Sequence, residues 1–285
     1  MILNENYTLS NGVEIPRIGL GTWEISDDTV AQAVKDAVGI GYTHIDTAQG
    51  YGNERGVGEG IRNCGEKRET LFVTTKLEAA IKNYDKAVAA IDGSLKKSGL
   101  DYFDMMIIHA PKPWAEYDKE DRHFEGNVEA WRALEDGYKA GKLRAIGVSN
   151  FQKVDIDNLI DNGSVKPMVN QILTHISNTP FELIEFCQRS NILVEAYSPI
   201  AHGVLLKNQD VIRIAEKYNV SVAQLSIRYC LEMCLLPLPK TANPKHMKNN
   251  ADVDFTITEE DMTTLKCVEK IKDYGEFSHF PVFWK

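Results

Sequence analysis

Short apolar runs alternate with helical patterns along most of the chain. Eight of these runs, most of them rich in Ile, Val and Leu, are typical of strands that are buried on both faces of a parallel sheet. Between two of the runs, Tyr84, Val88, Ile91 and Leu95 recur at helical spacing and stop at Gly99, which favours a helix end. The predicted strands are 18–21, 43–46, 71–75, 102–109, 145–149, 168–171, 192–197 and 235–238.

A β-hairpin is expected before the first of these strands. Apolar residues alternate through 7–15 on either side of the pair Asn11-Gly12. This pair is a strong hairpin signal, because a tight two-residue turn needs two residues that tolerate positive φ.

Two capping boxes predict where the last two long helices begin. In a capping box the first side chain accepts a hydrogen bond from the backbone three residues later, and the side chain there accepts one in return. The two boxes are Ser221-x-x-Gln224 and Thr258-x-x-Asp261.

The chain, residues 1–285, is expected to form one domain, because no linker, charge block or low-complexity tract divides it. Eight strands with helical crossovers predict an α/β fold, the (β/α)8 TIM barrel, with an N-terminal β-hairpin and a C-terminal tail over the barrel mouth. A doubly wound sheet is disfavoured. The glycine cluster at 56–60 follows residues 53–55 instead of a strand and does not have the Gly-x-Gly-x-x-Gly spacing.

The composition describes a globular chain able to bury a large core, with 43% hydrophobic and 26% charged residues. Its 41 acidic against 32 basic residues give a net charge of −9 without any basic tract, so neither nucleic acid nor a membrane surface is an expected partner. Residues 1–10 lack a signal-peptide pattern, and no apolar run approaches the ~20 residues of a membrane span. Five cysteines without zinc or redox spacing predict reduced thiols, no metal site and a cytoplasmic protein.

Polar residues close most of the predicted strands. In a barrel of this kind the active site forms at the C-terminal ends of the strands, so we expect these residues to form a ring of hydrogen-bonding groups. In chain order they are Asp46, Lys76, His109, Ser149-Asn150, Asn170-Gln171, Tyr197-Ser198 and Lys240-Thr241.

Four residues point to acid catalysis by a phenol, namely Asp46, Lys76 and His109 together with Tyr51 on the loop after Asp46. A free tyrosine, with a pKa of about 10, is a poor proton donor and acceptor at neutral pH. A lysine ammonium about 4 Å away would favour phenolate by on the order of two or three pKa units before desolvation is subtracted. Asp46 would keep Lys76 charged and aimed, and His109 would hold the substrate oxygen or share the proton.

A barrel glycoside hydrolase that uses two carboxylates is the rival interpretation. Glu195 lies on the seventh predicted strand, on the same side as Tyr197, and would act together with Asp46. This interpretation leaves Lys76, Tyr197 and Lys240 without a role.

The strand-end residues lie in five motifs that, in this order, resemble those of the aldo-keto reductases, and the resemblance runs from about residue 7 to residue 283. It implies an NAD(P)H-dependent reductase of aldehydes or ketones that transfers hydride from nicotinamide, acts on a small-molecule carbonyl substrate and is a monomer. The motifs are Gly41-x4-Asp46-Thr47-Ala48-x2-Tyr51-Gly52-Asn53-Glu54, Val73-Thr74-Thr75-Lys76-Leu77, Leu100-Asp101-Tyr102-Phe103-Asp104 running to Ile108-His109, Gly141-Lys142 to Gly147-Val148-Ser149-Asn150-Phe151, and Leu238-Pro239-Lys240-Thr241.

The resemblance also implies roles for the site residues. Tyr51 is the proton donor, Lys76 and Asp46 tune its pKa, and His109 orients the carbonyl. Nicotinamide lies against Tyr197, and its carboxamide is hydrogen-bonded by Ser149, Asn150 and Gln171. The loop after Tyr197 runs along the pyrophosphate. The implied cofactor-binding residues are Thr22, Asp46, Ser149, Asn150, Gln171, Tyr197, Ser198, Pro199, Ile200, Lys240, Thr241, His246 and Asn250.

NADPH is the expected cofactor, with NADH less excluded than in typical members of this family. The chain has His246 where an arginine commonly grips the 2′-phosphate of NADPH. A largely neutral imidazole forfeits a charge-assisted contact of roughly 1.5–3 kcal/mol, which is on the order of ten- to a hundredfold in affinity. Lys240, Thr241 and Lys245 remain to hold the phosphate.

The substrate pocket is expected to contain Trp23, His109 and Trp114. Ala110 stands where many family members carry a tryptophan, so we expect a more open wall there that Trp114 refills. The tail, with Phe277, Phe280, Phe283 and Trp284, is expected to fold over the mouth as an apolar wall or to pin the terminus.

A regulatory barrel that binds the nucleotide with little turnover is the second alternative function, and the four catalytic candidates argue against it.

Overall fold

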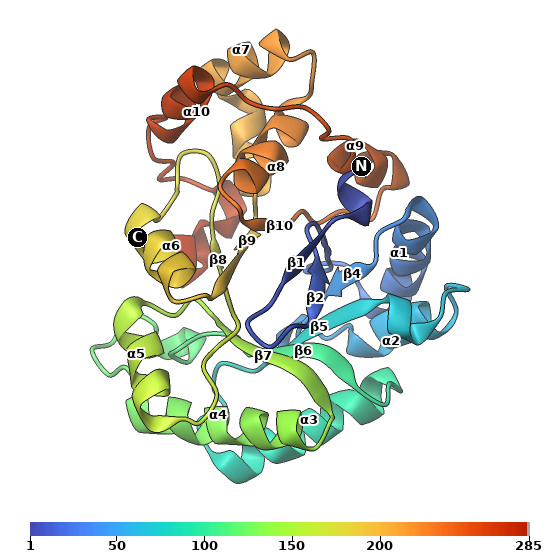
Figure 1. Ribbon diagram of the computed structural model, residues 1–285, viewed down its shortest axis with the longest axis vertical. Coiled ribbons are helices and arrows are strands. Elements are labelled where there is room, and N and C mark those ends of the chain that lie inside the picture. Colours follow the sequence, from blue (N-terminus) through green and yellow to red (C-terminus); the bar gives the residue numbers. More distant parts are fainter. Residues whose placement is uncertain (284–285) are drawn as a thin grey trace.

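Eight parallel strands surrounded by helices form a closed barrel in the computed structural model, which describes residues 1–283 (Figure 1). The backbone N–H of Gly19 donates to Pro237 O over 3.2 Å and that of Gly21 donates to Pro239 O over 3.1 Å, so the first and last strands of the barrel are joined. The predicted (β/α)8 fold is confirmed. The strands are β3 (Leu20–Gly21), β4 (His44–Asp46), β5 (Phe72–Leu77), β6 (Phe103–Ile108), β7 (Leu143–Ser149), β8 (Val169–Leu173), β9 (Leu193–Tyr197) and β10 (Leu236–Leu238).

The helices follow the strands and cover the outside of the barrel. The predicted start at Tyr84 and end before Gly99 are confirmed, and Gly99 takes the left-handed conformation with φ 65°. Among residues 1–283, no helix has both the length and the apolar character needed to cross a bilayer. The helices are α1 (Asp27–Ile40), α2 (Glu54–Arg62), α3 (Tyr84–Ser98), α4 (Phe124–Lys139), α5 (Lys153–Asn162), α6 (Phe181–Arg189), α7 (Gln209–Lys217), α8 (Val222–Glu232), α9 (Pro244–Ala251) and α10 (Glu259–Lys266).

The N-terminal hairpin is present, but its turn differs from the prediction. Strands β1 (Asn6–Thr8) and β2 (Glu14–Pro16) pair antiparallel. Leu9 N donates to Val13 O over 2.8 Å, so three residues instead of two make the turn, and of the expected pair only Gly12 has positive φ, at 84°. The expectation of two left-handed residues was wrong because in a three-residue loop only the last position requires that conformation.

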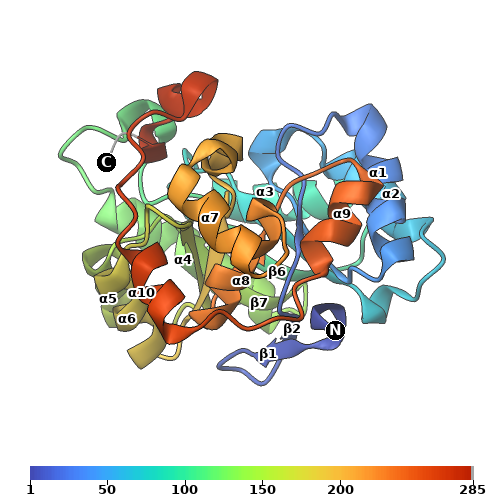
Figure 2. The same cartoon turned by 90° about the horizontal axis from the view of Figure 1, so that it is seen from above.

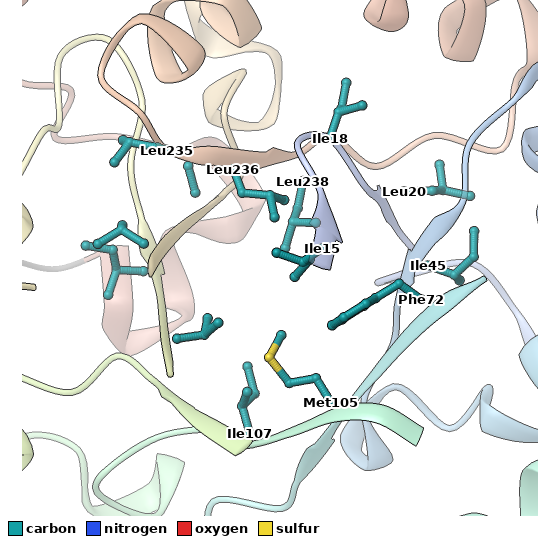
Figure 3. Close-up of a cluster of buried hydrophobic side chains, with 14 of the residues drawn as sticks. Ile15, Ile18, Leu20, Ile45, Phe72, Met105, Ile107, Leu235, Leu236 and Leu238 are labelled. Atoms are coloured by element: carbon teal, nitrogen blue, oxygen red, sulfur yellow. The ribbon is translucent and has the colours of Figure 1, made fainter. Parts of the chain in front are cut away.

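The hairpin and the C-terminal tail close opposite ends of the barrel (Figure 2). Ile15 of β2 is fully buried and lies beside Leu238 (Figure 3). Phe72, Met105 and Ile107 also point toward the barrel interior and are at most 3% exposed. An apolar core therefore fills the barrel at the hairpin end, and the polar ends of the strands lie toward the tail.

The two capping boxes have different outcomes. The Ser221 box at the start of α8 is complete. At α10, the Thr258 hydroxyl accepts from Asp261 N over 3.2 Å, but Thr258 N donates to Tyr218 Oη over 2.9 Å. Asp261 does not complete the box because its carboxylate accepts from Lys217 Nζ over 2.6 Å and from Tyr218 Oη over 2.7 Å.

The glycine cluster at 56–60 serves helix packing. It lies in α2, which runs against α1 and α3. A Cβ added at Gly58 would lie 1.9 Å from the backbone oxygen of Ser98 at the end of α3, so no side chain fits there. These glycines therefore allow close helix contact instead of cradling a phosphate, which agrees with the rejection of a doubly wound sheet.

Candidate active site

A cavity of about 540 Å³ opens at the C-terminal ends of the strands. Lys76 does not line it but lies beneath it, fully buried. Most of the ring expected from the strand ends is therefore brought together. The strand-end side chains that line the cavity are Asp46, His109, Ser149, Asn150, Gln171, Tyr197, Ser198 and Lys240.

Lys76 connects Asp46 and Tyr51, the two other members of the candidate catalytic group. Its Nζ donates to Asp46 Oδ1 over 2.5 Å, to Thr47 O over 3.0 Å and to Tyr51 Oη over 3.2 Å. All three donor hydrogens of the ammonium are therefore used. Since Lys76 donates to the phenol oxygen, the hydrogen of Tyr51 is left for a group in the cavity.

The pKa of Tyr51 does not fall as the sequence suggested. Burial raises the pKa of Tyr51 above its usual value, and this effect outweighs the lowering by the Lys76 ammonium, while Asp46 raises it further. Asp46 correspondingly helps to raise the pKa of Lys76 against its own burial. At neutral pH the group therefore consists of a protonated phenol above a charged lysine, which is the state needed to donate a proton.

His109 faces Tyr51 across the cavity and is neutral. The two ring centroids lie 5.7 Å apart at an interplanar angle of 74°. Burial and the Lys76 charge hold the pKa of His109 well below its usual value. Its backbone is fixed by hydrogen bonds to Leu77 O over 3.0 Å and from Asn150 Nδ2 over 3.1 Å. A neutral imidazole in this position is able to hydrogen-bond to a substrate oxygen without taking the proton of Tyr51.

The loop that carries Tyr51 is held by Asn53. The Nδ2 of Asn53 donates to Thr22 O and to Ile25 O, both over 2.9 Å, and its Oδ1 accepts from Thr47 Oγ1 over 2.7 Å. These bonds tie the loop after β4 to the loop after β3. Tyr51 is thereby positioned by backbone contacts that a sequence pattern alone does not reveal.

Polar groups toward the C-terminal ends of β7, β8 and β9 form one hydrogen-bonded cluster. Tyr197 Oη donates to Asn150 Oδ1 over 2.8 Å, and Asn150 Nδ2 donates to Ser149 Oγ over 3.0 Å. Ser149 Oγ donates in turn to Gln171 O over 2.8 Å. Asn170 leaves the expected ring, because strand alternation turns it outward, where its Nδ2 donates to Phe151 O over 3.0 Å.

Glu195 is buried and does not line the cavity. The Nε2 of Gln171 donates both to Glu195 Oε2 over 2.8 Å and to Asp46 Oδ2 over 3.0 Å. Burial and the Asp46 charge raise the pKa of Glu195 to about 8, so it is mostly protonated at neutral pH. The carboxylate pair of the rival hydrolase is therefore not presented to a substrate, because Glu195 faces protein and Asp46 is paired with Lys76.

The loop after β9 lines the cavity through Ser198, Pro199 and Ile200. His202 follows it, with its ring stacked on Phe277 of the tail at 4.0 Å and its Nε2 within 3.0 Å of Ser198 Oγ. Burial lowers the pKa of His202 to about 4, so the ring is neutral at physiological pH. This histidine joins the loop expected along a pyrophosphate to the tail over the mouth.

Four predicted cofactor residues do not line this cavity, namely Thr22, Thr241, His246 and Asn250. The Thr22 hydroxyl is buried and donates to Asp46 O over 2.9 Å. His246 is exposed and Asn250 is buried, and both lie on α9, beyond the end of β10. Lys240, by contrast, lines the cavity.

Aromatic side chains form the apolar wall of the cavity. Trp114 lies 5.3 Å from the His109 ring and, with Tyr117, packs beside the small Ala110, as expected. Trp23 contacts Phe280 of the tail at 5.1 Å. The tail, through Phe277, Phe280, Val282 and Phe283, both lines the cavity and anchors the chain end, whereas Trp284 lies outside the described residues.

The sequence analysis missed three titratable residues of the cavity, Glu24, Glu78 and His202. Strand alternation gives a signal for Glu78, which directly follows β5, two residues beyond Lys76, and therefore continues its inward-facing positions. The other two lie on loops whose course no periodic pattern predicts. Within residues 1–283, no cluster of three or more His, Cys, Asp or Glu side chains is arranged to hold a metal ion, and all five cysteines are free.

Comparisons with known proteins give one consistent result. A profile of the Aldo/keto reductase family matches residues 17–270. The glyoxal reductase of Bacillus subtilis is 40% identical over 275 residues, which cover 96% of this chain and 96% of that protein. The crystal structure of an aldo/keto reductase from Brucella melitensis is 38% identical with a TM-score of 0.87, covering 93% of this chain and 98% of that one. A Bombyx mori aldo-keto reductase, crystallised in complex with NADP, is 34% identical with a TM-score of 0.85 and covers 99% of each chain.

Proposed function

Because the chain belongs to the aldo/keto reductase family, we propose that Tyr51 is the proton donor of its reaction. The protein is an NAD(P)H-dependent oxidoreductase that reduces carbonyl groups. The observation that carries the assignment of Tyr51 is the hydrogen bond from Lys76 Nζ to its oxygen over 3.2 Å, with the ammonium itself bound to Asp46. This arrangement leaves the phenol hydrogen free for the substrate.

A nicotinamide held by Ser149, Asn150, Gln171 and Tyr197 would supply the hydride, and the protein supplies the proton. Tyr51 transfers its proton from Oη to the carbonyl oxygen as negative charge develops there. Lys76 stabilises the phenolate that remains. Because Lys76 is buried away from water, its attraction to the phenolate oxygen is strong. Asp46 keeps Lys76 charged, and the neutral His109 orients the carbonyl oxygen.

The hydrogen-bonded cluster of Ser149, Asn150, Gln171 and Tyr197 fits a nicotinamide ring with its carboxamide. Tyr197 lines the cavity with its hydroxyl tied to Asn150, so one aromatic face is available for stacking. Both hydrogens of Gln171 Nε2 are used by Asp46 and Glu195, which leaves Gln171 Oε1 as an acceptor for a carboxamide N–H. Ser149 and Asn150 are proposed to hydrogen-bond the same group.

The rest of the dinucleotide is proposed to run from this cluster toward α9. Ser198, Pro199 and Ile200 would follow the pyrophosphate, and Lys240 at the cavity wall would contact the phosphates. Thr241, His246 and Asn250 lie beyond it and would contact the adenosine half, while Thr22 supports Asp46. NADPH is the proposed cofactor, with NADH accepted more readily than by enzymes that carry an arginine in place of His246.

Substituting His246→Arg tests the cofactor assignment. We expect Kd for NADPH to fall about tenfold, because a guanidinium restores a charge-assisted contact with the 2′-phosphate. Kd for NADH, which lacks that phosphate, should change by less than about twofold. Asn162→Arg, which adds the same charge at the end of α5, is the matched control. An equal gain for both nucleotides in fluorescence titrations would contradict the assignment.

The function itself is tested by cofactor titration followed by turnover. The intrinsic fluorescence of the purified protein should be quenched on titration with NADPH. When glyoxal or an aromatic aldehyde is then added, the protein should oxidise NADPH, as measured by the nicotinamide absorbance. Binding without turnover would favour the regulatory alternative. If the protein bound neither NADPH nor NADH, the mechanism proposed above would be wrong.

We further propose that the chain works as a single barrel domain, whose own strands and loops carry the proposed catalytic group, and that it works as a monomer. A small-molecule carbonyl compound is its proposed partner. The expected cytoplasmic location is supported by the five free thiols, two of which, Cys187 and Cys230, are buried in the core.

A further inference from the structure

We propose that Glu78 sets the charge selectivity of the substrate pocket, so that uncharged aliphatic and aromatic carbonyls are accepted and carbonyls that carry a carboxylate are rejected. This inference rests on the reductase function proposed above and concerns the same cavity. It assigns a specificity role to a side chain that takes no part in the proton transfer.

The first observation is that Glu78 lies at the same level of the barrel as His109, the residue proposed to orient the substrate oxygen. Lys76 pairs with Ile107 and Leu77 with Ile108 in the β5·β6 register. His109 N donates to Leu77 O over 3.0 Å, so the register continues and places Glu78 beside His109. Glu78 is therefore one inward-facing position nearer the mouth than Lys76 and lines the cavity.

The second observation is that the Glu78 carboxylate has no compensating cation. Within residues 1–283 its side chain makes neither an ion pair nor a hydrogen bond, and only its backbone N–H is used, donating to Gln49 Oε1 over 2.9 Å. Lys76, the nearest buried cation along the strand, is committed to Asp46 and Tyr51. Burial raises the pKa of Glu78, and no positive charge among residues 1–283 offsets this effect.

The carboxylate is also held against the catalytic loop. A Cβ on Gly50 would lie 3.0 Å from Glu78 Oε2, so the side chain packs on the backbone immediately before Tyr51. The next residue, Ala79, is buried under Trp114 and Val282. Glu78 therefore lies between the proton donor and the apolar wall, where the remainder of a substrate would be placed.

The third observation is the charge of the other groups around the cavity. Among the described cavity residues, Lys240 is the sole Lys or Arg, and it follows β10, three strands from β5 around the barrel. His109 and His202 are neutral, because burial holds the pKa of each below its usual value. Glu24 adds a second carboxylate at the rim. Among the described residues, the substrate end of the cavity thus offers an anion no cation. Like charges a few ångströms apart in a partly screened cavity disfavour binding by about tenfold or more.

The test compares two aldehydes of nearly the same shape, 4-formylbenzamide and 4-formylbenzoate, with NADPH as cofactor at about pH 8, where carboxyl groups are ionised. The readout is the ratio of kcat/KM for the amide to that for the carboxylate. We expect a wild-type ratio of at least about ten. In Glu78→Gln, which keeps the shape and removes the charge, the ratio should fall about fivefold or more, whereas Glu78→Asp should retain most of it.

Glu66→Gln, which removes an exposed charge far from the cavity, is the matched control and should leave the ratio unchanged. Independently of any variant, raising the salt concentration from about 0.02 M to about 0.5 M should lower the wild-type ratio, since screening weakens the repulsion. A wild-type ratio near one, or a ratio that Glu78→Gln leaves unchanged, overturns the inference while the reductase function stands. Reduction of neither aldehyde, nor of glyoxal, overturns the proposed function as well.

Discussion

Replacing Tyr51 by Phe is expected to lower kcat by about 10²- to 10⁴-fold, the usual contribution of a positioned general acid. The phenyl ring keeps its edge-to-face contact with His109, whose centroid lies 5.7 Å away, so the cavity should retain its shape. Only the donated proton and the hydrogen bond from Lys76 are lost. Steady-state turnover of an aldehyde with NADPH measures the effect, and the Kd of NADPH should change by less than about twofold.

Tyr84→Phe is the matched control for this substitution. Its hydroxyl donates to Asp136 over 2.8 Å on the surface between α3 and α4, far from the cavity. Turnover should therefore stay at the wild-type level. If Tyr51→Phe retained more than a tenth of the wild-type kcat, another group would have to supply the proton and the assignment would be wrong.

Asp46→Asn is expected to lower the free energy of unfolding by roughly 3–5 kcal/mol at neutral pH. The same substitution should also lower turnover. Lys76 is fully buried, and within residues 1–283 Asp46 is its sole charged acceptor, at 2.5 Å. Removing the carboxylate leaves an uncompensated ammonium in the interior. Urea unfolding of the variant measures the loss. Asp92→Asn, which breaks an exposed pair with Lys142 of the same 2.5 Å length, should cost at most about 1 kcal/mol.

In Asp46→Asn, the contribution of Lys76 to the pH dependence of the free energy of unfolding should change sign. In the wild type the pKa of Lys76 is raised, so its contribution is fully present below the unfolded pKa of about 10.4 and is lost as pH rises through the folded pKa. Without Asp46, burial lowers the pKa of Lys76, so the unfolded state binds more protons and stability rises with pH up to about 10. The double variant Asp46→Asn/Lys76→Met should be more stable than Asp46→Asn alone. A double variant as unstable as the single one would contradict the account.

The barrel and the positions of its candidate catalytic side chains could be predicted because both follow local rules. Buried parallel strands have nearly continuous apolar runs, and in a barrel the residue that closes each run reaches the mouth. Asp46, His109 and Tyr197 are found there for this reason. The length of each strand was less predictable, since β5 continues to Leu77 and β8 to Leu173, where hydrogen bonds between neighbouring strands extend past the polar residues.

The parts that could not be predicted depend on competition between groups that are distant in sequence. The direction of the Tyr51 pKa shift follows from burial by the surrounding loops, which outweighs the charge of Lys76. Similarly, Asp261 fails to complete its capping box because Lys217 and Tyr218 occupy its carboxylate. The pairing of Gln171 with Glu195 likewise becomes visible only when β8 and β9 lie side by side.

The closure of the barrel has a consequence for the order of folding. The pair that seals it, Gly21 N to Pro239 O, joins segments from nearly opposite ends of the chain. Contacts of such large sequence separation form slowly, because loop-closure entropy must be overcome before they contribute. During synthesis the sheet from β3 to β9 keeps two open edges, at β3 and β9, until β10 emerges. Carbonyl reduction therefore becomes possible only in a nearly finished polypeptide, and the unsealed intermediate is the species most exposed to aggregation and to chaperones.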